Sequence, residues 1–334
     1  MELRFNIVYT PGTVRFLHFF AFSLLRRLNC SFRLAANGCS PEEIHLLRRM
    51  CGRYPDRAEL LRLPFHEVVT HGQALSYLQS LERSDHFCFM DSDILATGDF
   101  LSDITPLVGR YAGVFSGTPL WCRDEEQILP EAFPFMVGRY NRTDKDVCLG
   151  STFLAVYDNR VLAQVIQATG INFEWRSWPD IPSRCQDQLT WMGLARREYD
   201  VGKLLNLLLL GQGEHLVHVE SPHLHHIGGM STYISSRRGS NPRKGFFSRL
   251  RALGRRLMGP KDTQRSSGDE SAVLRMERRK ESMNRYFSEL LKALVDHRPL
   301  PGIPNLDDSE IQERVQRVTK HVVDLHRAFE AEQL

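Results

Sequence analysis

The stretch that decides the fold is HFCFMDSD, at residues 86–93. Its first part, His86–Met90, is a continuous apolar run, which is typical of a central parallel strand buried on both faces of a sheet. The run stops abruptly at Asp91-Ser92-Asp93. Ligands of open α/β sheets bind just outside the carboxyl ends of the strands, so the sequence predicts the mouth of a site here.

Strand-like and helix-like segments alternate around this stretch, as in an α/β sheet. Besides 86–90, we expect strands at 5–9, 31–36, 66–70, 112–116, 152–157 and 216–219. Helices are expected at 14–28, from 41 onward and at 74–81; the second has a strong start in Ser40-Pro41-Glu42-Glu43, with an N-cap, a first-turn proline and acids facing the helix dipole. The pattern predicts an α/β fold with a C-terminal helical extension.

Composition and charge are those of an ordinary globular chain. The 334 residues are 42% hydrophobic and 25% charged, with a net charge of +3, which gives no reason to expect nucleic acid as a partner. Seven cysteines without a C-x-x-C pair argue against a zinc ribbon or a disulfide scaffold and favour a reduced, cytoplasmic setting. The first residues read as a strand rather than a signal peptide, and the apolar stretch 14–28 is too short and too charged to span a bilayer.

The basic charge is concentrated in one segment, because Arg237–Lys261 holds nine Lys and Arg and no acid. Within it, Arg243–Met258 mixes arginine with apolar residues and could lie on an anionic membrane surface, with about 1 kcal/mol from each basic residue. A solvated linker fits the glycines equally well, and RNA binding is a third, weaker reading. The membrane reading would place the protein at the inner membrane face as a peripheral protein.

Asp91 and Asp93 could both face one hard cation, since they are separated by a single residue at a strand end. A polar turn that caps the strand is the alternative. The apolar strand before them favours the metal reading, because two carboxylates in a partly desolvated place repel each other unless a cation lies between them.

A second group of polar residues is HLHHIGGMS, at residues 223–231. A neutral imidazole suits manganese or a similar ion, and either His225 or His226 could be the third ligand. Gly228-Gly229 would let the backbone approach a phosphate, and Ser231 could donate a hydrogen bond. The alternatives are a surface loop with incidental histidines or, less well supported, a small zinc site.

Five segments together resemble GT-A glycosyltransferases, the nucleotide-sugar-dependent class. FMDSDIL at 89–95 resembles their D-x-D segment; YT at 9–10, HGQAL at 71–75, LGSTFL at 149–154 and HIGG at 226–229 fall in the order of that family. The resemblance covers residues 1 to about 235. It implies the Rossmann-like GT-A fold, whose mixed, mostly parallel sheet has flanking helices. It also implies metal-dependent transfer of a sugar from a nucleotide-diphosphate sugar, with UDP the commonest carrier, to a glycan or lipid-linked acceptor.

The resemblance also implies roles for individual residues. The metal, Mn2+ or Mg2+, would be held by Asp91, Asp93 and His226. The nucleotide sugar would be bound by Tyr9, Thr10, Asn37, His71, Gly72, Ser92, Gly150, Ser151, Gly228, Gly229 and Ser231.

Asp187-Gln188 matches an Asp-Gln pair that many GT-A enzymes place at the reactive sugar carbon. Asp187 would be the base of an inverting enzyme, whereas either residue would support the departing sugar in a retaining one. An ordinary helix start is the alternative.

Trp175 and Trp178, with Trp121, could stack on a sugar acceptor or belong to the core. A second D-x-D, Asp144 to Asp146, lies in a polar loop and reads as a solvated turn.

These patterns divide the chain into a catalytic domain at 1–235, a basic segment at 236–268 and a helical extension at 269–334. In the extension, apolar residues recur at helical spacing at 283–294 and 311–329, and the second run could pack on the catalytic domain or form a homo-oligomer. Two other functions stay open. A sugar nucleotidyltransferase lacks support because its glycine-rich run is missing, and a non-catalytic scaffold on the same fold would usually have lost one metal ligand.

Overall fold

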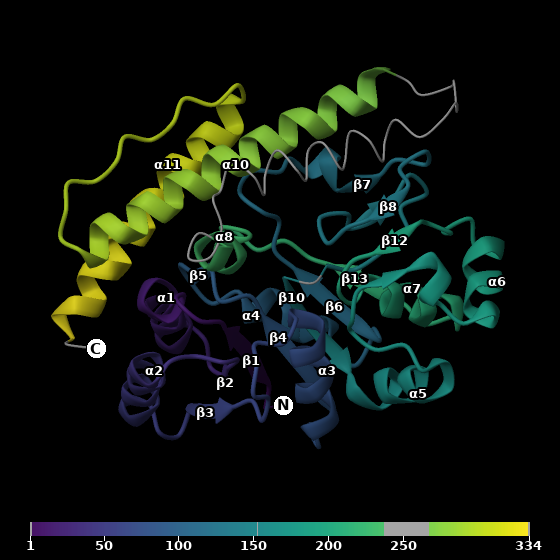
Figure 1. Cartoon of the computed structure of the whole chain (residues 1–334), viewed down its shortest axis with the longest axis horizontal. Helices are drawn as coiled ribbons and strands as arrows, with labels where there is room; N and C mark the ends of the chain where they lie inside the picture. The colour runs from purple at the N-terminus through teal and green to yellow at the C-terminus, as the bar shows by residue number, and fades with distance from the viewer. Residues whose placement is uncertain (1, 152, 237–266, 333–334) are drawn as a thin grey trace.

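The protein is described here by a computed structural model, which covers residues 2–151, 153–236 and 267–332 (Figure 1). Its centre is a seven-stranded sheet in which β10 runs antiparallel to both neighbours and the other strand pairs are parallel. The strand order is β13 (Leu216–His218), β6 (Gly113–Ser116), β10 (Leu154–Asp158), β4 (His86–Met90), β1 (Arg4–Tyr9), β2 (Ser31–Ala36) and β3 (Ala58–Arg62). The predicted mixed, mostly parallel sheet is confirmed.

Strand β4 lies in the middle of the sheet and is buried on both faces, as its apolar run predicts. Because side chains alternate along a strand, Phe87 and Phe89 belong to one core cluster, while Cys88 and Met90 belong to the other. The first cluster is covered by α3 (His71–Leu81), α5 (Asn159–Thr169), α6 (Ser183–Trp191) and α7 (Lys203–Gly211). The second is covered by α1 (Val14–Arg27), α2 (Pro41–Arg53) and the C-terminal helices.

The strand predicted at 66–70 is wrong. The third strand along the chain is β3, and residues 66–70 form bends and irregular loop before α3. A side chain rather than a neighbouring strand satisfies this loop: Asn37 Nδ2 donates to Val69 O at 2.8 Å, and Val69 N donates to Asn37 Oδ1 at 3.0 Å. With its backbone groups used in this way, the segment joins no sheet.

The predicted start of α2 is confirmed, and it also fixes the turn that follows β1. Glu43 N donates to Ser40 Oγ and Ser40 N donates to Glu43 Oε2, which is a capping box. The other carboxylate oxygen of Glu43 accepts from Gly12 N at 2.7 Å. The loop beside the carboxyl end of β1 is therefore held from α2.

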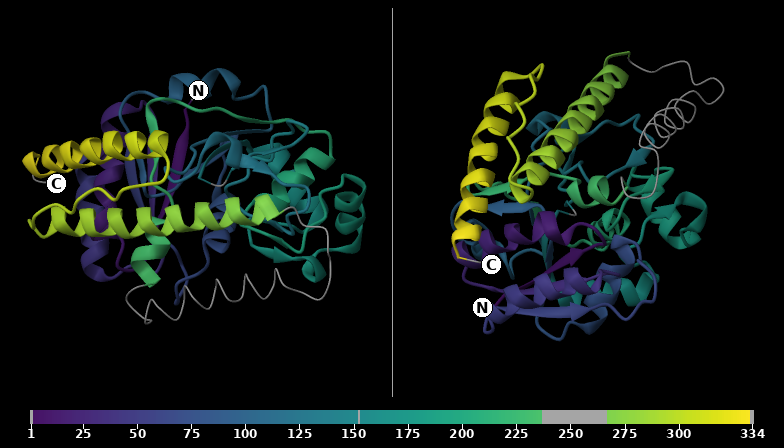
Figure 2. Two further views of the ribbon diagram at one scale, coloured as in Figure 1. Left: turned by 90° about the horizontal axis from the view of Figure 1, so that it is seen from above. Right: turned by 60° about the vertical axis from the view of Figure 1, so that its left-hand side comes forward.

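Helices α10 (Ser267–Val295) and α11 (Ser309–Ala331) lie over α1 and over α8 (Met230–Ser236), as Figures 1 and 2 show. Their apolar faces are buried in the same core cluster as α1 and α2. The spaced residues of α11 thus pack within the chain; the buried ones are Ile311, Val315, Val318, Val322 and Phe329. Asp308, which precedes α11, caps it by accepting from Ile311 N at 3.0 Å.

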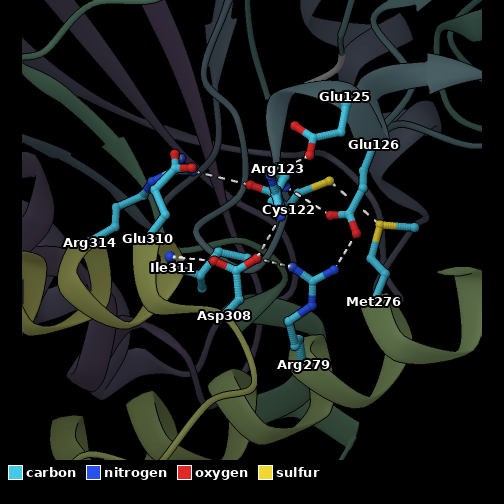
Figure 3. A network of polar contacts seen from close by, with 10 residues as sticks. All are labelled: Cys122, Arg123, Glu125, Glu126, Met276, Arg279, Asp308, Glu310, Ile311 and Arg314. Carbon is cyan, nitrogen blue, oxygen red and sulfur yellow. Dashed lines mark hydrogen bonds and ion pairs between the residues drawn. The ribbon is translucent and has the colours of Figure 1, made fainter.

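A network of charged side chains joins both C-terminal helices to the loop at 122–126 (Figure 3). Arg279 of α10 is buried and pairs with Glu126 and with Asp308, the latter at 3.8 Å. Arg123 pairs with the same Asp308 at 3.3 Å, and Arg314 of α11 donates to Cys122 O at 3.1 Å. One loop of the sheet domain therefore sets the position of both helices.

Two other sequence expectations concern cysteines and membranes. All seven cysteines are free, and five of them are buried. Within the described ranges, no helix combines the length and the apolar character needed to cross a bilayer. The basic segment Arg243–Met258 lies outside the described residues.

Short strands complete the fold around the carboxyl end of β4. They are β5 (Ile94–Ala96) with β14 (Leu224–His226), β7 (Ile128–Leu129) with β9 (Arg142–Thr143), and β11 (Arg176–Ser177), β12 (Glu198–Tyr199) and β8 (Phe135–Met136). The pair β5–β14 builds the site described next.

Candidate metal and nucleotide site

Two aspartates occupy the end of β4, as the sequence predicts. Asp91 directly follows the strand, and its N–H donates to Phe153 O at 2.7 Å, which fixes the backbone at the strand end. The Asp91 side chain is 27% exposed and the Asp93 side chain only 3%. One carboxylate therefore faces the open space while the other lies within the fold.

Backbone pairing brings His226 to these carboxylates from far along the chain. Strand β5 begins one residue after Asp93, and β14 pairs antiparallel with it, so that His226 lies opposite Ile94. His226 Nε2 is 3.2 Å from Asp91 Oδ2 and 3.4 Å from Asp93 Oδ1. The sequence leaves open whether His225 or His226 is near the two aspartates, and in the structure it is His226.

This cluster fits a divalent cation. One ligand atom from each of Asp91, Asp93 and His226 lies within 4.8 Å of the others, and this is the only such group of His, Cys, Asp and Glu among the described residues. Both ring nitrogens of His226 are buried, and neither has a partner with hydrogen-bond geometry in the described chain. Two carboxylates and an imidazole are a donor set that manganese and magnesium sites use.

The electrostatics of the cluster also favour a positive charge beside Asp91 and Asp93. Burial alone would lower the pKa of His226, but its contacts with Asp91 and Asp93 and their charges outweigh burial and raise it to about 9. Burial likewise opposes ionisation of Asp93, yet the contact with His226 and the Met230 N–H lower its pKa. That N–H donates to Asp93 Oδ2 at 2.9 Å. Bound metal would replace the proton that His226 otherwise holds.

The loop after His226 approaches the site closely because it contains two glycines. Gly228 and Gly229 have φ values of +91° and +81°, which disfavour other residues. A Cβ at Gly228 would lie 3.0 Å from Trp121 Nε1 and 3.1 Å from Pro119 Cβ. Ser231, which follows, shares a hydrogen bond of 2.8 Å with Ser92 between the hydroxyl oxygens.

These elements border a cavity of about 1030 Å³. Nine of the predicted site residues line it: Thr10, His71, Asp91, Ser92, Asp93, His226, Gly228, Gly229 and Ser231. The Nε2 atom of His71 is buried and has no hydrogen-bond partner among the described residues. The structure thus gathers, around one space, predicted residues from four separate parts of the chain.

Other predicted nucleotide-binding residues lie behind the cavity wall. Tyr9 is fully buried, and burial raises the pKa of its hydroxyl. Asn37 holds the loop at Val69, and a Cβ at Gly72 would lie 2.6 Å from Phe173 O. Gly150 packs beside Asn206, and Ser151 is buried. None of these five is among the lining residues.

The predicted catalytic pair lies on α6. Asp187 is exposed there, and the Gln188 side chain packs so close to Gly211 that a Cβ on that glycine would meet it at 2.3 Å. Neither residue lines the cavity that contains the cluster of Asp91, Asp93 and His226. Asp144 and Asp146 lie in an exposed loop, where Asp146 pairs with Arg142 at 3.6 Å, in agreement with the solvated turn.

Asp200 lines the cavity instead and was missed in the sequence. Its carboxylate accepts from Gly138 N at 3.1 Å and from Val201 N at 2.8 Å, so backbone groups fix its orientation. The helix that follows is anchored by Lys203, which is fully buried and donates to the carbonyls of Tyr140 and Gly150. Burial lowers the pKa of Lys203 to about 7. An acid placed directly before a helix, in Tyr199-Asp200-Val201, was the available signal.

A second cavity of about 530 Å³ adjoins the first, and the two share Val137, Arg139, Asp200 and Glu277. Its wall carries three aromatic side chains: Phe133, Phe135 and Trp175. Trp175 is 48% exposed, whereas Trp178 packs against the core and lines neither cavity. Trp121 lines the first cavity.

Comparisons with known proteins find likeness in structure only. No protein-family model matches the chain, and no curated protein matches its sequence. The similar solved structures include three glycosyltransferases. GlyE from Streptococcus pneumoniae is 11% identical, over 66% of this chain and 45% of that chain, with a TM-score of 0.38. The galactosyltransferase LgtC, in complex with donor and acceptor sugar analogues, is 9% identical, over 65% of this chain and 73% of that chain, with a TM-score of 0.36. The mannosyltransferase PcManGT from Pyrobaculum calidifontis, in complex with GDP-Man and Mn2+, is 11% identical, over 96% of this chain and 84% of that chain, with a TM-score of 0.42. The match covers less than half of GlyE. A function for this chain therefore has to come from its own residues.

Proposed function

We propose that the protein is a metal-dependent glycosyltransferase that moves a sugar from a nucleotide-diphosphate sugar to a hydroxyl-bearing acceptor. The observation that carries the proposal is the convergence of Asp91, Asp93 and His226, within 4.8 Å, on the wall of a cavity large enough for such a donor. A UDP-sugar is proposed first, because UDP is the commonest carrier among D-x-D enzymes, and Mn2+ or Mg2+ as the ion.

The three clustered residues would hold the ion, which supplies positive charge to the diphosphate as it leaves. Asp93 and His226 are held by the fold and give fixed ligand positions. Asp91 is more exposed, so it can reach the ribose or a water as well. Ser92 and Ser231, linked at 2.8 Å, and the Gly229 N–H would bind donor oxygens.

Asp200 takes the role that the sequence assigns to Asp187. Its support is that Asp200 lines both cavities, so it could face a donor in the first and an acceptor in the second. In the reaction, the acceptor oxygen bonds to the sugar carbon C1 while the bond from C1 to the phosphate oxygen breaks, and its electron pair leaves with the diphosphate. Asp200 would take the acceptor proton or stabilise the cationic sugar.

The acceptor would occupy the second cavity. Trp175 presents a half-exposed aromatic face, and aromatic faces with nearby carboxylates are suited to a sugar ring and its hydroxyls. A glycan or a lipid-linked glycan fits this description.

The test is release of nucleoside diphosphate from a panel of UDP- and GDP-sugars, with and without Mn2+, for the wild-type protein and Asp93→Asn. Metal-dependent release from one donor, lost in the variant, would establish the reaction class. Because an acceptor is needed for turnover, binding of UDP and GDP is measured in parallel. The absence of both nucleoside diphosphate release and nucleotide binding would contradict the proposal and would favour a non-catalytic protein.

A further inference from the structure

Helix α10 carries a positive charge to the cavity that holds the metal cluster. Glu277, Lys280 and Asn284 lie at helical spacing on one face of α10, and the first two line the cavity. Asn284 is buried beside the glycine loop, since a Cβ at Gly229 would lie 3.6 Å from its Nδ2. This face of the C-terminal extension is thus part of the wall and not only a cover for the core.

The two Lys and Arg side chains on the described wall are Arg139 and Lys280. Arg139 is already engaged: Nη1 is 3.1 Å from Glu277 Oε1, and Nη2 donates to Tyr140 Oη at 2.7 Å. Lys280 has no carboxylate within ion-pair distance among the described residues, and its Nζ lies over the Trp121 ring, 5.3 Å from the centroid. Its charge is therefore available to a ligand.

Trp121 connects this lysine to the glycine loop. Its Nε1–H is buried without a hydrogen-bond partner in the described chain, and the Cβ position of Gly228 is 3.0 Å from that nitrogen. A buried donor without a partner is costly unless a ligand or water completes it. The cation and the donor therefore meet at one indole ring, on the cavity wall that also carries Gly228 and Gly229.

We propose that Lys280, assisted by the Trp121 indole N–H, binds the diphosphate group of the donor and of the nucleoside diphosphate that leaves. The proposal rests on the proposed function and adds a residue from the C-terminal extension. When the bond from C1 breaks, the diphosphate gains negative charge, and the ammonium group of Lys280 would stabilise it without transferring a proton. Helix α10 would then be required for donor binding and turnover.

The experiment measures binding of UDP, GDP, UMP and GMP by calorimetry with Mn2+ present, in the wild-type protein, Lys280→Ala, Lys280→Arg and Arg278→Ala. Arg278 is an exposed cation on the same helix and is the matched control. Whichever of UDP and GDP the wild-type protein binds, we expect Lys280→Ala to lower the affinity for that diphosphate by about tenfold to a hundredfold. The affinity for the corresponding monophosphate should fall by about threefold at most. Lys280→Arg should recover most of the loss, and Arg278→Ala should match the wild type.

The outcomes separate this inference from the proposed function. Wild-type protein that binds neither UDP nor GDP would overturn both. Wild-type binding that is unchanged in Lys280→Ala, or weakened equally for the diphosphate and the monophosphate, would overturn only the role of Lys280. As an independent measurement, Trp121→Phe keeps the ring under the lysine and removes the N–H, so it should weaken diphosphate binding by a smaller factor, about threefold to tenfold.

Discussion

The two walls of the cavity are built in different ways. The strand-end wall carries Asp91, Asp93 and His226, and backbone hydrogen bonds of β4, β5 and β14 fix it. The wall formed by α10 carries Lys280, and side-chain ion pairs and apolar contacts fix it. Metal ligands need closely fixed positions, whereas a single ammonium group can follow its ligand. The difference therefore suits a fixed metal centre with an adjustable second cation.

The largest effect is expected at the strand-end wall. Asp93→Asn removes a ligand charge but keeps the size of the side chain, and we expect metal-dependent turnover to fall at least about 100-fold. Stability should fall as well, because Asp93 and His226 favour each other's charged forms in the folded protein, so turnover is compared under conditions where the variant is folded. The measurements are turnover with Mn2+ and denaturant unfolding. Full activity in a folded Asp93→Asn protein would contradict the assignment of this wall to the metal.

The attachment of α10 is expected to depend on Arg279. Arg279→Ala removes a buried cation from Glu126 and Asp308, whose side chains are largely covered, and the loss should approach the cost of about 3–5 kcal/mol for one member of a buried pair. Urea unfolding measures this cost, with Arg285→Ala, an exposed change on the same helix, as the control.

The same variant tests the comparison between the two walls. If the strand-end wall is independent of α10, folded Arg279→Ala should still bind Mn2+ while diphosphate affinity declines. Loss of Mn2+ binding in parallel with diphosphate binding, under conditions where the protein is folded, would show that the walls are one unit.

Helix α11 is attached through an aromatic contact at its end. The Phe329 ring lies 4.9 Å from His18, 5.6 Å from Phe22 and 6.2 Å from Phe19, between ring centroids. Phe329→Ala should lower the free energy of unfolding by about 3 kcal/mol, the usual cost for a buried phenylalanine. Arg327→Ala, on the exposed side of the same turn, should cost less than about 0.5 kcal/mol. Equal effects in the two variants would show that α11 is not held by this contact.

The strand-end wall could be predicted from sequence because its signals are local. The apolar run that contains Phe87 and Phe89 is followed by two aspartates, and the glycines after His226 indicate that the backbone approaches the site closely. The partner of His226 depends on a pairing between β5 and β14, 130 residues apart in sequence, and only the resemblance to a known family suggested it.

The rest of the site has no comparable local signal. Asp187 and Asp200 both lie near a helix start, and which of them faces the cavity depends on how α6 and α7 pack. Lys280 stands in the charged run Arg278-Arg279-Lys280-Glu281, where one arginine is buried in a network and the lysine lines a cavity. Spacing alone does not distinguish those positions.

Acid should weaken the contact between α1 and the C-terminal helices. Burial, opposed by the hydrogen bond to the Val14 carbonyl and aided by the charges of Arg49 and His326, lowers the pKa of His18 to about 4. Between pH 6.5 and 4 the unfolded chain therefore binds a proton that the folded chain does not. Stability falls as pH falls through this window, by at most about 1.4 kcal/mol per pH unit. Urea unfolding at several pH values, compared between wild type and His18→Phe, isolates this dependence; identical slopes would contradict it.

The smallest effect is expected at the surface ion pair between α1 and the end of α10. Arg15 Nη2 lies 2.7 Å from Asp296 Oδ1, but the two side chains are 57% and 37% exposed, so water screens the attraction. A double-mutant cycle with Arg15→Ala and Asp296→Ala should give a coupling of at most about 1 kcal/mol that declines with added salt. If the coupling instead equalled the cost of Arg279→Ala, surface charge rather than the buried network would hold α10. Lys280 would then lose its fixed support at high ionic strength, and diphosphate binding would weaken with the ion pair.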